Sequence, residues 1–200
     1  MVDESIIIAI GPVATVLEDL GVAYYICGSV ASSMHGMPRA TNDIDAVAAL
    51  KQEHVEEFVA RLKDDYYLAP PAIRKAISRF GSFNLIHHES GYKVDIFITG
   101  RRAYDSEAMS RRFYQPFEEE PFEISFWIAA PEDVLLSKLD WFRKGGEVSN
   151  NQWHDILGIC KIQQPNLDQG YLRSWAGELK VDDLLRLAFL DSGIESKEQE

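Results

Sequence analysis

Strand-like segments are confined to the first two-thirds of this chain, whereas helix-like segments occur throughout it. Up to residue 128, short runs of β-branched and aromatic residues alternate with segments whose apolar residues are spaced as in amphipathic helices. From Pro131 onward only the helical spacing remains. This order predicts an α/β (α+β) fold, with a mixed sheet flanked by helices and a helical C-terminal module. We place the α/β domain at residues 1–130, the helical module at 131–190 and a polar tail at 191–200.

Composition narrows the classes of function. The 200 residues include 32 acidic and 20 basic side chains, which gives a net charge of −12. General binding to DNA or RNA needs clustered Lys and Arg, so this balance disfavours it and instead suits a cation or a basic partner. The two cysteines form no CxxC pair, which indicates reduced, buried thiols. The apolar run 6–10 is too short to span a membrane, so we expect a soluble cytoplasmic protein.

Three carboxylates stand in predicted strands. Asp43 and Asp45 flank Ile44, and because side chains alternate along a strand, both carboxylates should lie on one face. Asp95 lies inside an apolar strand, the second strand of a predicted hairpin over 83–98. A buried carboxylate needs compensation, which a Mg²⁺ or Mn²⁺ ion shared with Asp43 and Asp45 would supply. The alternatives are a solvated Asp-x-Asp face and pairing of Asp95 with Lys93 or Arg39.

The dipeptide Gly28-Ser29 separates a predicted strand over 22–27 from a predicted helix. Glycine lets a phosphate approach the backbone, while the helix N-terminus and the serine hydroxyl supply hydrogen-bond donors. An ordinary turn is the alternative interpretation of this pair alone. Followed by Asp-x-Asp on the next strand, the pair predicts a phosphate cradle beside a metal site, as a Mg²⁺-bound nucleoside triphosphate requires.

Residues 28–45 resemble the signature of the nucleotidyltransferase superfamily, which has the polymerase-beta-like fold. The most specific part is Pro-Arg-Ala-Thr-x-Asp-Ile-Asp, at 38–45, and the stretches 131–138 and 152–156 extend the similarity. In detail the pattern is similar to minimal nucleotidyltransferases and to AbiEii/MenA-type toxins. The resemblance implies the nucleotidyltransferase fold and a metal-dependent transfer of a nucleoside monophosphate from an NTP to an acceptor hydroxyl, with release of pyrophosphate.

The resemblance also implies roles for individual residues. Three carboxylates would hold Mg²⁺ or Mn²⁺ and act in catalysis: Asp43, Asp45 and Asp95. Four residues would bind the nucleotide and its phosphates: Gly28, Ser29, Arg39 and Lys138. Two of these have other interpretations, because Arg39 could pair with an Asp of the site and Lys138 could be a solvated helix residue.

The acceptor stays open at this level among RNA, protein and a small cationic molecule. A toxin–antitoxin or defence setting would add an antitoxin partner. The net charge of −12 fits a cationic substrate better than RNA, which favours an aminoglycoside-type nucleotidyltransferase as the alternative enzyme. A catalytically silent module of the same fold, which binds a nucleotide or a partner, is the alternative outside the enzymes.

Overall fold

Residues 4–119 and 122–194 are described by a computed structural model. They fall into two units: the first takes in the described residues within 1–30 and 40–129, and the second those within 31–39 and 130–200. Residues 195–200 of the predicted polar tail lie outside the described residues. The division falls inside helix α2 (Gly28–His35), whose first three residues belong to the first unit.

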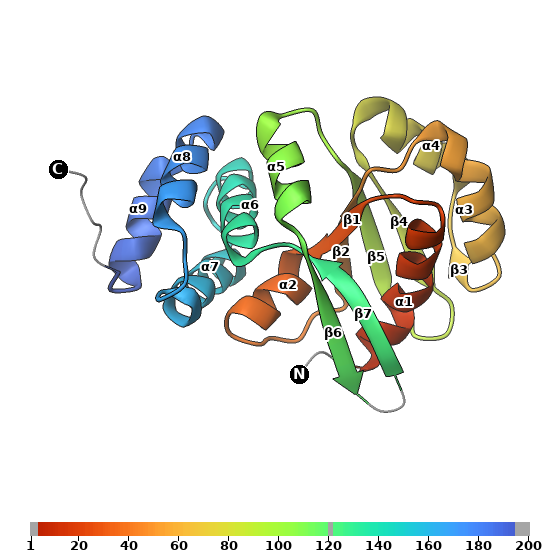
Figure 1. The fold of residues 1–200 in the computed structure, drawn as a ribbon, viewed down its shortest axis with the longest axis horizontal. Helices are drawn as coiled ribbons and strands as arrows, with labels where there is room; N and C mark the ends of the chain where they lie inside the picture. The colour runs from red at the N-terminus through yellow and green to blue at the C-terminus, as the bar shows by residue number, and fades with distance from the viewer. Residues whose placement is uncertain (1–3, 120–121, 195–200) are drawn as a thin grey trace. The chain divides into compact units, whose positions relative to one another are not determined.

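The first unit is built on a seven-stranded mixed sheet with helices around it (Figure 1). Its strands are β1 (Tyr24–Cys27), β2 (Asp43–Ala48), β3 (Tyr66–Tyr67), β4 (Ser82–His87), β5 (Lys93–Ile98), β6 (Phe113–Glu119) and β7 (Phe122–Ile128). Its further elements are α1 (Glu4–Asp19), the 3-10 turn η1 (Gln52–His54), α3 (Val55–Leu62), α4 (Pro70–Arg79) and α5 (Ala103–Arg111). The strand order is β3-β4-β5-β2-β1-β7-β6. β2 pairs in parallel with β5 and antiparallel with β1.

One face of this sheet forms the core of the first unit. Ile44 in β2 and Val94 in β5 are fully buried on that face. Helix α3 covers it through Phe58, whose ring meets Phe83 edge-on with centroids 6.1 Å apart. Helix α1 covers it too, since the Tyr66 hydroxyl donates a hydrogen bond of 2.9 Å to the Ala9 carbonyl. Because side chains alternate, the residues on either side of Ile44 and Val94 lie on the opposite face.

The second unit is helical. It contains α6 (Pro131–Lys144), α7 (Asn150–Gln163), α8 (Gln169–Leu179) and α9 (Asp182–Asp191). Helix α6 begins with Pro131, whose fixed φ suits a first helical position, and carries basic side chains in its last turn, where they favour the helix dipole. It packs on α7 through stacked rings of Phe142 and Trp153, 5.2 Å apart. It meets α8 where the Tyr171 hydroxyl donates to Asp133 at 2.6 Å.

The predicted fold class is confirmed, and most predicted elements are present. The hairpin of β4 and β5 has the expected antiparallel pairing. Helix α5 and strand β6 were not predicted, because α5 buries only Tyr104 and Ala108 and β6 contains Pro116. Within the part of the chain that the structure describes, no helix has the length and apolar character needed to cross a membrane.

Candidate functional site

The strand register brings the three predicted carboxylates onto one face of the sheet. In the parallel pair of β2 and β5, Asp45 lies opposite Asp95, and Asp43 lies opposite Lys93. Partners in a register have side chains on the same face, and i and i+2 residues share it as well. Asp43, Asp45, Lys93 and Asp95 therefore form a block of two neighbouring pairs, which we call the carboxylate face. Its side chains are half-buried or exposed, whereas Ile44 behind them is fully buried.

Lys93 is the cation of the carboxylate face. Its Nζ donates a hydrogen bond of 2.6 Å to Asp95 Oδ2 and lies 3.4 Å from Asp43 Oδ1. The hydrogen bond to Asp95 raises the pKa of Lys93, and the charges of Asp95 and Asp43 act in the same direction. Pairing of Asp95 with Lys93, which the sequence left open, is therefore present. Their i, i+2 spacing in one strand was the signal for it.

Gly28 lies directly against the Asp45 carboxylate. Cys27 pairs with Asp45 in the antiparallel register of β1 and β2, so the chain passes from β1 into α2 beside this side chain. A Cβ at Gly28 would come within 1.9 Å of Asp45 Oδ2. The φ of Gly28 is +58°, in the region that favours glycine. The lack of space for a Cβ and the positive φ both require glycine at position 28. This is where the predicted phosphate cradle meets Asp45, a predicted metal ligand.

The carboxylate face suits a hard divalent cation by its donor chemistry. Carboxylate oxygens are the ligands that Mg²⁺ prefers, and the Lys93 ammonium already stands as a cation between Asp43 and Asp95. Among the residues that the structure describes, no three or more His, Cys, Asp or Glu side chains lie close enough together to hold a metal ion. The residues that would hold one are Asp43, Asp45 and Asp95, with the Lys93 ammonium displaced.

A second charged cluster belongs to the helical unit. Asp155 in α7 has a side chain only 3% exposed and accepts hydrogen bonds from two cations. Arg39 donates through Nε to Oδ1 at 3.0 Å and through Nη2 to Oδ2 at 3.2 Å. Lys138 Nζ in α6 donates to Oδ2 at 2.8 Å. Two cations thus meet at the carboxylate of Asp155, and we call Arg39, Lys138 and Asp155 the basic triad.

The basic triad bears on the alternative interpretations of Arg39 and Lys138. Arg39 pairs with an aspartate, Asp155, which the sequence had not singled out as a site residue. Lys138 is 7% exposed, so its interpretation as a solvated helix residue is wrong. The sequence similarity at 152–156 marked Asp155 without giving it a role. The sequence could not show that Asp155 pairs with Arg39, because the two residues are 116 positions apart.

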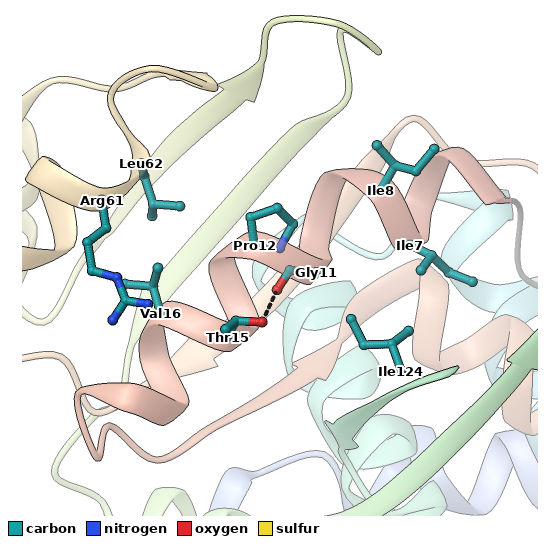
Figure 2. Close-up of a pocket in the computed structure, with 9 residues that line it drawn as sticks. All are labelled: Ile7, Ile8, Gly11, Pro12, Thr15, Val16, Arg61, Leu62 and Ile124. Carbon is teal, nitrogen blue, oxygen red and sulfur yellow. Dashed lines mark hydrogen bonds between the residues drawn. The ribbon is translucent and has the colours of Figure 1, made fainter. Parts of the chain in front are cut away.

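A separate apolar groove in the first unit carries none of this chemistry. It runs along α1 and is lined by Ile7, Pro12 and Leu62, with Ile124 of β7 at one side (Figure 2). The charged residue in its lining, Arg61, is paired with Asp19 at 2.5 Å. The groove therefore offers packing surface but no free charge for a reaction.

Comparison with known proteins supports the fold through structure rather than sequence. No protein-family model matches the chain, and no curated protein matches it. An antigenic nucleotidyltransferase-like protein from Paracoccidioides brasiliensis superposes with a TM-score of 0.52 at 16% identity, over 97% of this chain and 95% of that one. The antibiotic-resistance factor ANT(2'')-Ia superposes with a TM-score of 0.53 at 14% identity, over 95% of this chain and 94% of that one.

The chain has the nucleotidyltransferase fold, as the resemblance in its sequence implied. At identities of 14–16% the likeness establishes the fold, and the reaction has to be argued from the residues. The finer similarity to AbiEii/MenA-type toxins stays a prediction.

Proposed function

We propose that this protein is a metal-dependent nucleotidyltransferase, which moves a nucleoside monophosphate from an NTP to an acceptor hydroxyl. The observation that carries the proposal is the carboxylate face. Asp43, Asp45 and Asp95 share one side of two adjacent parallel strands, and Gly28 lies against Asp45 where α2 begins. In a nucleotidyltransferase fold this arrangement supports a hard-oxygen cation site beside a helix N-terminus that can bind phosphate.

Each group of residues has a part in the proposed reaction. Asp43, Asp45 and Asp95 would hold the divalent cations, which would supply positive charge to offset the charge of the triphosphate. Asp95 also orients the acceptor hydroxyl and takes its proton. The hydroxyl oxygen then bonds to the α-phosphorus, the bond from that phosphorus to the bridging oxygen of the β-phosphate breaks, and pyrophosphate leaves.

Four further residues are proposed to bind the triphosphate. Gly28 lets a phosphate approach the backbone, and Ser29 contributes its hydroxyl and a backbone N–H at the start of α2. Arg39 and Lys138 contribute positive charge. Support for their part comes from the basic triad, where the guanidinium of Arg39 and the ammonium of Lys138 meet at the Asp155 carboxylate and are held at fixed positions.

A small cationic molecule is the acceptor that we favour within this proposal. The chain has a net charge of −12, and the exposed carboxylate face adds local negative charge. Such a surface attracts a cation and repels the phosphates of RNA. The choice of an aminoglycoside-type acceptor rests on this charge, since the likeness to ANT(2'')-Ia at 14% identity shows the fold alone. A toxin–antitoxin role, with an antitoxin as partner, rests on the sequence similarity at 28–45.

The test is a transfer assay with each labelled NTP in turn, in the presence of Mg²⁺ or Mn²⁺. The acceptors are an aminoglycoside mixture, bulk tRNA and a protein extract, each in a separate reaction. Asp45→Asn removes the charge of one proposed metal ligand and preserves the shape of the side chain. Asp64→Asn, in the exposed turn after α3, makes the same charge change away from the site and serves as the control.

Label transfer with the wild type and with Asp64→Asn, but lowered at least about a thousandfold in Asp45→Asn, is the expected result. The acceptor that becomes labelled identifies the substrate class. Metal-dependent NTP binding without transfer to any acceptor would favour the catalytically silent module. Equal transfer by wild type and Asp45→Asn would refute the proposed site.

A further inference from the structure

The carboxylate face needs a counter-charge in the free protein. Three carboxylates on neighbouring positions of β2 and β5 repel one another, and this repulsion opposes the pairing of the two strands. Lys93 relieves it, because its ammonium contacts Asp95 at 2.6 Å and Asp43 at 3.4 Å from one point. One side chain thus attracts carboxylates that belong to two different strands.

The backbone of Lys93 is fixed, while its side chain is free to leave. Its neighbour Val94 is fully buried, and the β2–β5 register runs without interruption from Asp43 to Ala48. The Lys93 side chain itself is 36% exposed and has four methylene groups between the backbone and the ammonium. The ammonium can therefore move into solvent without any change in the sheet.

A divalent cation and the Lys93 ammonium require the same oxygens. Magnesium binds carboxylate oxygens at roughly 2.0–2.1 Å, and the ammonium already takes Asp95 Oδ2 as its hydrogen-bond acceptor. A metal on Asp43 and Asp95 would lie within a few ångströms of the ammonium. Two cations at that separation repel each other strongly, so the two states exclude one another.

We propose that Lys93 is a built-in counter-cation, which assembles the carboxylate face in the free protein and competes directly with the divalent metal for Asp43 and Asp95. This inference rests on the proposed metal-dependent function and adds a regulatory element to it. Lys93 keeps the carboxylates together until a metal arrives, and it weakens the binding of metal alone. Metal that arrives together with a nucleotide brings additional binding energy, which offsets the displacement of the ammonium.

The experiment measures Mn²⁺ binding by isothermal titration calorimetry, without nucleotide, on the full chain. Lys93→Met removes the charge and preserves the length of the side chain. Lys75→Met, at an exposed position of α4, makes the same change in net charge away from the carboxylate face. Thermal unfolding of all three proteins, free and with saturating Mn²⁺, is the second readout.

The expected result is that Lys93→Met binds Mn²⁺ roughly tenfold more tightly than the wild type, while Lys75→Met matches the wild type. The Lys93→Met variant should also unfold at a lower temperature than the wild type when free, but not when loaded with Mn²⁺. That second result separates direct competition from a general electrostatic effect, because an ammonium that stays in place would stabilise both states equally.

Three outcomes would overturn the inference in distinguishable ways. Equal Mn²⁺ affinity of the wild type and Lys93→Met would exclude competition and leave the proposed function standing. An equal loss of stability in the free and the loaded state would mean that Lys93 stays on Asp95 beside the metal. Absence of Mn²⁺ binding in the wild type and in Lys93→Met would refute the metal site, and with it the proposed function.

Discussion

The two charged clusters of this protein have opposite compositions. The carboxylate face has three acids and one lysine, which contacts two of them, and every member reaches solvent. In the basic triad two cations share Asp155, and both that carboxylate and Lys138 are buried. Acids are the majority in the first cluster and bases in the second.

Burial also separates the two clusters energetically. An exposed ion pair is screened by water and contributes little to stability, whereas removal of one partner from a buried pair leaves an uncompensated charge. The carboxylate face should therefore tolerate changes that alter metal binding while the fold survives. The basic triad should not, because Asp155 holds Arg39 together with the buried Lys138.

The largest effect is expected at Asp155. Asp155→Ala leaves the Lys138 ammonium, 7% exposed, without its counter-charge, so we expect a loss of about 3–5 kcal/mol in the free energy of unfolding. Urea denaturation followed by tryptophan fluorescence measures it, since Trp141, Trp153 and Trp175 lie in the helices of the second unit. Asp191→Ala, at the exposed end of α9, is the control. A loss below about 1 kcal/mol would show that the triad behaves like a surface pair.

A smaller loss is expected at Gly28. Gly28→Ala forces an alanine to adopt a φ near +58° and places its Cβ against the Asp45 carboxylate. We expect the free energy of unfolding to fall by roughly 1–3 kcal/mol. Gly91→Ala is a matched control, since Gly91 has a φ of +71° but nothing within 4 Å of its added Cβ. Denaturation of both variants isolates the contact with Asp45. Equal losses would mean that Asp45 moves aside without penalty.

A still smaller effect is expected at Asp43. Its side chain is 57% exposed and belongs to a face with excess negative charge, so Asp43→Asn should change the free energy of unfolding by less than about 1 kcal/mol in either direction. Mn²⁺ affinity should nevertheless fall, because a ligand is lost. A large loss of stability in chemical denaturation would contradict the contrast with Asp155.

The smallest effect is a dependence on pH. The pKa of Lys93 is raised in the folded protein, so the folded state holds this proton more tightly than the unfolded state does. The contribution is fully present below the unfolded pKa of about 10.4 and disappears as the pH rises through the folded pKa. The difference in stability between wild type and Lys93→Met should therefore be constant from pH 7 to 9 and shrink in more alkaline solution. Denaturation at a series of pH values measures it, and a difference that grew with pH would contradict the pairing.

Local patterns in the sequence were enough for much of the fold. The alternation around Ile44 gave the shared face of Asp43 and Asp45, and the run after Pro131 gave the helices of the second unit. The pairing of Arg39 with Asp155 could not be predicted from the sequence. A contact between positions 116 apart depends on tertiary packing and leaves no periodic pattern in the sequence. The pairing of Lys93 with Asp95 could be suggested from their i, i+2 spacing. Spacing alone, however, does not distinguish a counter-ion from a solvated lysine.

The parallel pairing of β2 with β5 also has a consequence for the order of folding. Asp45 and Asp95 are register partners although the whole segment from β2 to β5 separates them, so their meeting requires the closure of a long loop. The hairpin of β4 and β5 is local and can form earlier. Lys93 and Asp95 lie in that hairpin, so their ion pair is available before β2 docks. The nascent strand then presents an already paired carboxylate to Asp43 and Asp45, which lowers the electrostatic barrier to the pairing of β2 with β5.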